Sequence, residues 1–270
     1  MLEVRGLEKT FHPGTADEVR ALRGVDLSVP DGAFVVVIGT NGSGKSTLLN
    51  AVAGTFPPDA GSIRLDGEDV TAWGEDRRAR KVGRVFQNPF SGTAPGMTIA
   101  ENLSLAARRG KGRGIGPALP GSLVREIRAR VAALGMGLED RLESEIGTLS
   151  GGQRQALTLL MATWVRPRLL LLDEHTAALD PKTAEQVIRL TKAVVERDAL
   201  TTMMVTHSMT QAVHLGDRLV MMHRGRVLHE AAGEEKRRLR PEDLLARFEE
   251  VRRADRLDAA AADLLRALYV

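Results

Sequence analysis

The stretch from residue 33 to residue 53 constrains the fold of this chain more than any other part of its sequence. A continuous apolar run, Ala33–Ile38, leads into the glycine-rich loop Gly39-Thr-Asn-Gly-Ser-Gly-Lys45-Ser46, and a helical pattern follows over Thr47–Ala53. Such an apolar run is typical of a strand that is covered on both faces, as in a parallel sheet flanked by helices. We therefore predict an α/β fold in which this loop joins the carboxyl end of a buried parallel strand to a helix.

The loop has the spacing G-x-x-x-x-G-K-[ST], which is typical of phosphate binding. Its backbone N–H groups can point toward phosphate oxygens, and the start of the following helix adds the positive end of its dipole. Lys45 would place its ammonium group between the terminal phosphates of a nucleotide, and Ser46 would offer its hydroxyl to Mg²⁺. The alternative is a glycine-rich turn without a ligand, which the flanking strand and helix disfavour. The predicted nucleotide-binding residues are Gly39, Thr40, Asn41, Gly42, Ser43, Gly44, Lys45, Ser46 and Thr47.

A second apolar run, Leu169–Leu172, ends in the acidic pair Asp173 and Glu174. Ligands of open α/β sheets bind beyond the carboxyl ends of the strands, so both acids should lie near the phosphates. Adjacent strand residues point in opposite directions, which allows them different roles. We predict that Asp173 holds Mg²⁺, directly or through water, and that Glu174 deprotonates the attacking water. The alternative is an acidic cap between strand and loop, which the presence of the phosphate loop disfavours.

The rest of the chain divides into segments of different patterns. The N-terminal stretch alternates apolar and polar residues, and Ser62–Val70 contains a hairpin signal at Asp66-Gly67, so we predict an antiparallel β subdomain there. Met97–Trp164 is mostly helical in pattern and predicts a helical subdomain inserted at about residues 90–165. Its expected apolar positions are Leu103, Leu105, Ile127, Val131 and Leu134.

The C-terminal part becomes strongly charged from residue 233 onward. We expect a helix to begin at Pro241 and a further amphipathic helix to carry Leu257, Leu264, Leu265 and Leu268. The sequence thus predicts a single ATPase-type domain over residues 1–232 and a charged helical extension over residues 233–270.

Composition excludes several classes of protein. No apolar run approaches the ~20 residues of a membrane-spanning helix, and the N-terminus lacks the apolar core of a signal peptide, so we expect a cytosolic protein. The chain has no cysteine, which excludes disulfides and thiolate metal sites. Arg108–Gly121 is rich in glycine, arginine and proline and predicts a mobile surface loop. It lacks the interleaved aromatic residues of a nucleic-acid site, and we expect no nucleic-acid partner.

The motif Leu149-Ser150-Gly151-Gly152-Gln153, together with the loop and the acidic pair, resembles the ATP-binding cassette family over roughly residues 1–230. The resemblance implies that Phe11 stacks on adenine, in a loop between the first two strands. It implies that Gln87 senses Mg²⁺ and the attacking water and links to a transmembrane partner. Asp180 matches the segment that crosses the dimer interface, and His207 matches the histidine that contacts the γ-phosphate.

The family also implies a head-to-tail homodimer with two ATP molecules at its interface. Each ATP would lie between the phosphate loop of one copy and Ser150–Gln153 of the other. Gly151 and Gly152 would open a helix whose N–H groups, with the Ser150 hydroxyl, cap the γ-phosphate. Hydrolysis should then depend on dimerisation.

One position departs from the family pattern. Proline usually follows the catalytic glutamate, whereas this chain has His175, which we expect to be a solvent-facing loop residue. With the segments 92–102 and 159–163, this departure makes the chain similar to the ATPases of bacterial uptake systems whose permeases resemble those for branched-chain amino acids.

The resemblance therefore implies the ATPase subunit of a bacterial importer, peripheral on the cytoplasmic face of the membrane. Its partners would be permease subunits, docked around Gln87 and Asn88–Ala100, and an extracytoplasmic substrate-binding protein. One alternative is a cassette ATPase that acts on nucleic acid or ribosomes, which usually carries long insertions or a second cassette. Another is a nucleotide-binding regulator that never turns over, which the intact Glu174 and His207 disfavour.

Overall fold

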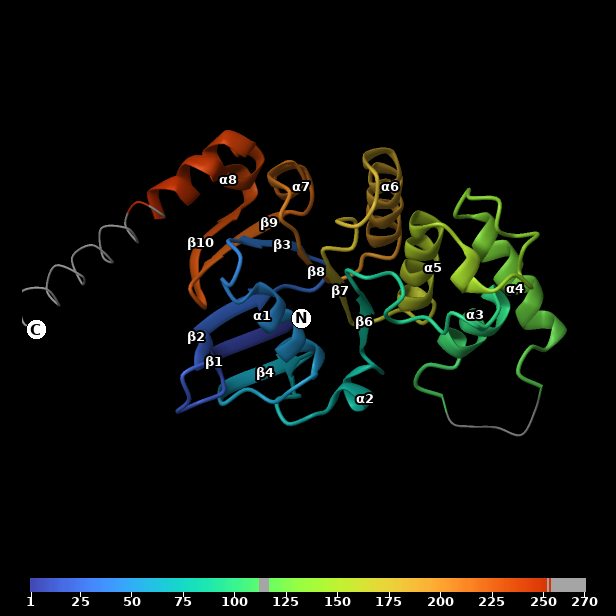
Figure 1. The fold of residues 1–270 in the computed structure, drawn as a ribbon, viewed down its shortest axis with the longest axis horizontal. Coiled ribbons are helices and arrows are strands. Elements are labelled where there is room, and N and C mark those ends of the chain that lie inside the picture. The colour runs from blue at the N-terminus through green and yellow to red at the C-terminus, as the bar shows by residue number, and fades with distance from the viewer. Residues whose placement is uncertain (112–116, 252, 254–270) are drawn as a thin grey trace, which may run out of the picture.

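Two β-sheets with helices between and beside them form the protein (Figure 1). The computed structural model describes residues 1–111, 117–251 and 253. The antiparallel sheet has the strand order β2-β1-β4-β5. Its strands are β1 Leu2–Phe11, β2 Val19–Val29, β4 Ala60–Leu65 and β5 Glu68–Asp69. The predicted antiparallel part, with a turn at Asp66-Gly67 between β4 and β5, is confirmed.

The second sheet has six strands in the order β10-β9-β3-β8-β7-β6. Its strands are β3 Phe34–Gly39, β6 Val82–Val85, β7 Leu169–Asp173, β8 Thr202–Val205, β9 Arg218–His223 and β10 Arg226–Ala232. All neighbours are parallel except β10, which pairs antiparallel with β9. The predicted apolar runs are the central strands β3, β7 and β8, so the expected α/β core is confirmed.

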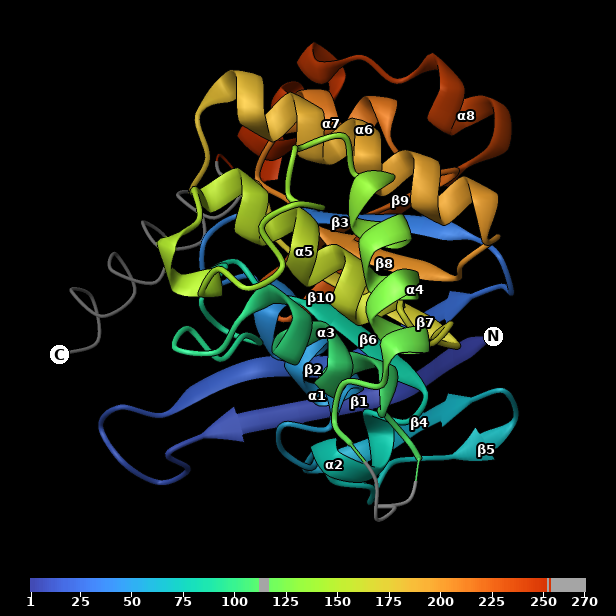
Figure 2. The ribbon, with the colours of Figure 1, turned by 90° about the vertical axis from the view of Figure 1, so that its right-hand side faces the viewer.

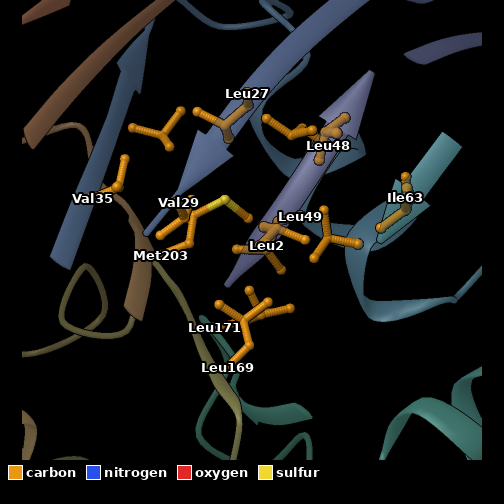
Figure 3. Packing of buried hydrophobic residues seen from close by; sticks show 14 of the residues in the cluster. Leu2, Leu27, Val29, Val35, Leu48, Leu49, Ile63, Leu169, Leu171 and Met203 are labelled. Atoms are coloured by element: carbon orange, nitrogen blue, oxygen red, sulfur yellow. The ribbon is translucent and has the colours of Figure 1, made fainter. Parts of the chain in front are cut away.

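Both faces of this six-stranded sheet are covered. Alternate side chains of the central strands, such as Val35, Leu171 and Met203, pack toward α1 (Lys45–Ala53) and the antiparallel sheet (Figure 3). The residues between them, such as Val36 and Leu172, pack on the opposite face against α6 (Pro181–Arg197) and α7 (Met209–His214). Figure 2 shows the same order of layers, with α6 and α7 above the sheet and the antiparallel strands below it. Burial on both faces explains why these strands are continuously apolar rather than alternating.

The helices after β6 form a cluster with its own apolar core at one end of the molecule (Figure 1). They are α3 Ile99–Ala107, α4 Gly121–Ala132, the short 3₁₀ turn Ile146–Thr148 and α5 Gly151–Thr163. Ile127 and Val131 are fully buried in this core, as expected, whereas Leu105 is 55% exposed, contrary to expectation. Leu105 is wrongly predicted because it lies on the outer face of α3, where neither α4 nor α5 covers it.

The arginine-rich segment before α4 is not simply a surface loop. Arg109 donates hydrogen bonds to the carbonyl oxygens of Ala162 and Val165 at the end of α5. Burial lowers the pKa of its guanidinium. Arg109 therefore caps the carbonyl end of a helix, a role that favours a cation. Residues 112–116 of the predicted mobile loop lie outside the described residues.

The charged C-terminal part begins with α8 (Gly233–Arg238), and a helix over residues 241–251 starts at Pro241, as predicted. Leu239, Leu244 and Phe248 are buried in the same apolar cluster as α6 and α7. Leu257, Leu264, Leu265 and Leu268 lie outside the described residues. Within the described part of the chain, no helix is both long and apolar enough to cross a lipid bilayer.

Candidate active site

The glycine-rich loop connects the end of β3 to the start of α1, as predicted. Two of its glycines are required by space. A Cβ atom on Gly39 would lie 2.4 Å from the Ser43 Oγ, and one on Gly44 would lie 2.4 Å from the Ala21 carbonyl oxygen. Gly44 also has a φ of 98°, a left-handed conformation that side chains disfavour. The loop can therefore follow this path only with glycine at these two positions.

The start of α1 fits an anion. The residue before the helix, Gly44, offers no side chain to cap it, and no acidic residue lies in the first turn. The first N–H groups of a helix need partners from outside the helix, and a phosphate supplies acceptors together with negative charge. Ser46 is exposed in this first turn, with its hydroxyl available beside the loop.

Lys45 is buried at this helix start and folds back over the loop. Its Nζ donates to the carbonyl oxygens of Gly39 at 2.9 Å and Thr40 at 3.1 Å. Burial lowers the pKa of Lys45, and the negative charges of Glu174 and Asp173 oppose that lowering. The loop and the acidic pair therefore share one electrostatic environment, as their positions at the carboxyl edge of the sheet predict.

Glu174 follows β7 directly, and its backbone N–H donates to the carbonyl oxygen of Val205 on β8 at 3.0 Å. Its φ is +43°, a conformation that costs a non-glycine residue on the order of 1–3 kcal/mol. Its carboxylate is only 10% exposed, and Oε1 lies 2.6 Å from the Nε2 of His207. The backbone is thus held in a strained form that turns the carboxylate toward the histidine after β8.

His207 itself is 46% exposed, so one side of its ring faces solvent. The neighbouring Thr206 is buried and donates to the Oε1 of Gln211 at 2.7 Å, while Gln211 donates to the Thr176 Oγ1 at 3.1 Å. These bonds tie the segment after β8 to the segment after Glu174. The structure therefore brings together Lys45, Asp173, Glu174 and His207, as the sequence predicts.

The segment Ser150–Gln153 opens α5, also as predicted. The Ser150 Oγ accepts from the N–H of Gln153 at 3.3 Å, and the Gln153 Oε1 accepts from the N–H of Ser150 at 3.2 Å. A Cβ atom on Gly152 would lie 2.0 Å from the Thr183 Cγ2 on α6, so this glycine allows the two helices to approach. Figure 1 shows β7 and β6 between α1 and α5. Within one chain, the phosphate loop and Ser150–Gln153 therefore lie on separated elements.

Three other predicted residues lie around this group. Phe11 is the last residue of β1 rather than a loop residue, because it pairs with Val19 on β2. Its ring packs edge-to-face on Phe56 at 5.4 Å between centroids. Gln87 is exposed just after β6. Asp180 caps α6 by accepting from the N–H of Thr183 at 3.1 Å. Hydrogen bonding by the side chain of Thr183, and then by its backbone N–H, lowers the pKa of the Asp180 carboxyl.

His175 does not face solvent, contrary to expectation. It is 1% exposed, and its Nε2 lies 3.0 Å from the Thr191 Oγ1 on α6. Thr191 donates its own proton to the Val187 carbonyl oxygen, so His175 must be the donor to Thr191. Burial lowers the pKa of His175 to about 4, which keeps the ring neutral at physiological pH. The prediction is wrong because the chain after Glu174 turns inward and packs against α6.

Sequence reasoning missed two mostly buried arginines that contact the carboxyl-terminal part of α1. Arg78 is 1% exposed and donates to the carbonyl oxygens of Ala51 and Val52 at the end of α1. It also donates to those of Val70 and Thr71, and its burial lowers the pKa of the guanidinium to about 10. Arg84 on β6 pairs with Asp173. A charged residue within the strand pattern of Val82–Val85 was the one available signal for Arg84.

Comparison with known proteins adds sequence and structural relatives to this description of the site. The family model described as "ABC transporter" matches residues 22–177. The tyrosine transport ATP-binding protein of Clostridioides difficile is 41% identical over 249 residues, which cover 92% of this chain and 99% of that protein. The lipoprotein-releasing system ATP-binding protein LolD 1 of Caulobacter vibrioides is 37% identical, covering 82% of this chain and 92% of that protein. Among solved structures, the dimeric ATP-binding cassette MJ0796 in a post-hydrolysis state with ADP and Pi has a TM-score of 0.73 and 29% identity. That similarity covers 86% of this chain and 98% of the other.

Proposed function

Because this chain belongs to the ABC transporter family, as the ATP-binding subunit that hydrolyses ATP, we propose that it drives import of an amino acid, with an aromatic one favoured. The single observation that supports this choice of transported molecule is the similarity to a tyrosine transport protein over nearly the whole of both chains. His175 and the segments 92–102 and 159–163 also resemble ATPases of bacterial uptake systems whose permeases resemble those for branched-chain amino acids. A branched-chain amino acid is therefore the second cargo to test.

The site residues divide the work of hydrolysis. Backbone N–H groups of Gly39–Thr47 and the Lys45 ammonium would bind the β- and γ-phosphates, and the Phe11 ring would stack on adenine. Ser46, Gln87 and Asp173 would hold Mg²⁺, which supplies positive charge on the phosphate oxygens and fits these oxygen donors. No cluster of three acidic or histidine side chains that could bind a metal alone occurs among the described residues. The phosphates of the nucleotide would complete the coordination.

Glu174 would act as the general base. Water attacks the γ-phosphorus, its proton passes to the Glu174 carboxylate, and the bond to the leaving ADP oxygen breaks. The 2.6 Å contact between Glu174 Oε1 and His207 Nε2 orients this carboxylate, and the exposed side of His207 would contact the γ-phosphate. The nearly buried position of Glu174 keeps its hydrogen bonds away from bulk solvent.

A second copy of the chain would complete each site. Ser150, Gly151, Gly152 and Gln153 of that copy would cap the γ-phosphate, and Asp180 would lie at the same interface. The separation of α5 from α1 within one chain and the similarity to dimeric cassettes support this arrangement.

Mixing two inactive variants tests the composite site. In a head-to-tail dimer of Lys45→Ala with Ser150→Arg, one site carries both changes and the other carries neither. We expect each variant alone to hydrolyse ATP poorly. In an equal mixture half of the dimers would be mixed and carry one native site, so about a quarter of the native activity should return. Failure of the mixture to recover activity, with both variants folded, would rule out the shared site.

We further propose that permease subunits dock around Gln87 and the segment 88–100, at the cytoplasmic face of the membrane where ATP is supplied. An extracytoplasmic substrate-binding protein would deliver the cargo. Residues 1–232, with the helical insertion at about 90–165, would form the ATPase domain. Residues 233–270 would be a charged helical extension, and the burial of Leu244 and Phe248 supports packing of its described part on this domain.

Reconstitution with a permease that co-purifies with this chain tests which molecule is transported. Tyrosine should stimulate ATP hydrolysis and be taken up into vesicles, while leucine serves as the branched-chain comparison. Recovery of the protein with ribosomes or nucleic acid, and with no permease, would instead favour the alternative function.

A further inference from the structure

The Asp173 carboxylate already has a cationic partner inside the protein. Arg84 on β6 reaches it across the sheet, with its Nη2 3.3 Å from the Asp173 Oδ2. In the parallel register, Arg84 lies opposite Leu171, two residues before Asp173. Both side chains are mostly buried, with 13% of Arg84 and 14% of Asp173 exposed. Water therefore screens this ion pair weakly.

Arg84 is fixed from several sides. Its Nη2 also donates to the Asn50 Oδ1 on α1 at 2.5 Å, and its Nη1 donates to the Thr55 Oγ1 at 3.4 Å. Its guanidinium carbon lies 4.5 Å from the centre of the Phe86 ring. A long cationic side chain held by two helix-end residues, a ring and a carboxylate cannot easily move away from the site. Its positive charge is thus a permanent part of the surroundings of Asp173.

The pair uses a single carboxylate oxygen of Asp173. A bidentate arginine would engage both oxygens, whereas here Oδ2 receives the hydrogen bond and Oδ1 is left for another ligand. The other charges near Asp173 are Lys45, whose pKa it helps to raise against burial, and its neighbour Glu174. Two cationic side chains and two carboxylates thus lie at this edge of the sheet, so their formal charges cancel before nucleotide binds.

We propose that Arg84 is a positioning residue that fixes Asp173 through Oδ2 and supplies a resident positive charge there, and so weakens the dependence of nucleotide binding on Mg²⁺. This inference rests on the proposed role of Asp173 as a magnesium ligand. Without Arg84, the nucleotide phosphates lose a nearby positive charge, and Mg²⁺ loses a nearby charge that repels it. Nucleotide binding without Mg²⁺ should therefore weaken, while Mg²⁺ itself should bind more tightly, so Mg²⁺ should increase the nucleotide affinity by a larger factor.

Calorimetric titration of ADP tests the proposal without any turnover. Arg84→Gln removes the charge but keeps a hydrogen-bonding side chain, and Arg84→Lys keeps the charge. For Arg84→Gln we expect the Mg²⁺ concentration at half-saturation to fall about tenfold, and ADP binding in EDTA to weaken several-fold. Arg84→Lys should stay close to the native protein. Arg64→Gln, an exposed arginine change on β4, is the matched control and should change neither quantity.

If folded Arg84→Gln needs the same Mg²⁺ concentration for half-saturation as the native protein, the proposal is wrong. A higher concentration would also overturn it, because it would mean that Arg84 only orients Asp173 and that its charge has no effect. If Arg84→Gln does not fold, Asn50→Asp offers Arg84 a second carboxylate and should shift the Mg²⁺ dependence in the same direction. Asp173→Asn separates the two levels of inference. If it leaves the Mg²⁺ dependence of ADP binding unchanged, the magnesium role of Asp173 is wrong; if it abolishes that dependence while Arg84→Gln behaves as native, only the role of Arg84 is wrong.

Discussion

At the carboxyl edge of the six-stranded sheet the site is built from charges that face one another, whereas Ser150–Gln153 at the start of α5 carries no charge. At the sheet edge, Asp173 pairs with Arg84, Glu174 pairs with His207, and Lys45 bonds to loop carbonyls. At the start of α5, a capping box and two glycines present little more than backbone N–H groups and a hydroxyl. We therefore propose that the first region binds and activates the nucleotide within one copy of the chain, and that the second completes the site of another copy.

Glu174→Gln should have the largest effect, because it should slow ATP hydrolysis without preventing ATP-driven dimerisation. Glutamine keeps the shape of the side chain and a hydrogen bond to His207 but cannot accept the proton from water. We expect ATP hydrolysis to fall by about 10²- to 10⁴-fold, while ATP-driven dimerisation remains. Phosphate release and size-exclusion chromatography with ATP measure the two effects. A folded variant with unchanged turnover would remove Glu174 from the role of base.

Lys45→Ala should remove binding at the sheet edge and leave the start of α5 intact. A hydrogen bond to a charged group contributes about 1.5–3 kcal/mol, so we expect nucleotide affinity to fall by about one to two orders of magnitude. Titration calorimetry measures it, and Lys192→Ala on the exposed face of α6 serves as the control. Native affinity in Lys45→Ala would contradict the assignment of the phosphate loop.

His175 makes the stability of the sheet-edge region dependent on pH. Its pKa is lowered to about 4 in the folded protein from 6.5, so the unfolded chain binds a proton more readily between these values. Stability should be fully present above pH 6.5 and should fall as the pH drops toward 4, by about 3 kcal/mol at most. Chemical denaturation at several pH values measures this fall.

His175→Gln keeps a donor to Thr191 but does not titrate, so its stability should change less with pH than that of the native protein. The exposed His12 provides the control, because His12→Gln should retain the native pH dependence. An equal fall in stability in the native protein and in His175→Gln would show that His175 titrates without consequence for folding.

Gly152→Ala should disturb the start of α5 without touching the charges at the sheet edge. The added Cβ would overlap the Thr183 Cγ2, so we expect a loss of about 1–3 kcal/mol in the free energy of unfolding. Removing that methyl group in the double variant Gly152→Ala, Thr183→Ser should restore most of the loss while keeping the hydroxyl at position 183. If the double variant is no more stable than Gly152→Ala, contact with Thr183 is not the reason for glycine at this position.

The same contrast explains what sequence reasoning could and could not predict. The positions of Lys45, Glu174 and Ser150 follow from local rules, because a glycine loop, a strand end and a helix start fix where the backbone places these residues. Arg84 and His175 instead contact Asp173 and Thr191 from distant segments. Arg84 has a local signal, a charge within a strand pattern, but that signal does not identify its partner, and no local pattern shows that His175 is buried. Phe11 is predicted to lie in a loop because Thr10 and His12 flank it, whereas the pairing of β1 with β2 continues as far as Phe11 and Val19.

Arg78 has a consequence for how the protein opens. Its guanidinium bonds to carbonyl oxygens at the end of α1 and to those of Val70 and Thr71, which follow β5. Releasing either segment alone would leave one terminal nitrogen of the buried guanidinium without its acceptors, which costs more than releasing both segments and exposing the whole side chain to water. The helix that carries the phosphate loop and the residues after β5 should therefore exchange their amide hydrogens as one cooperative unit, with a common opening free energy.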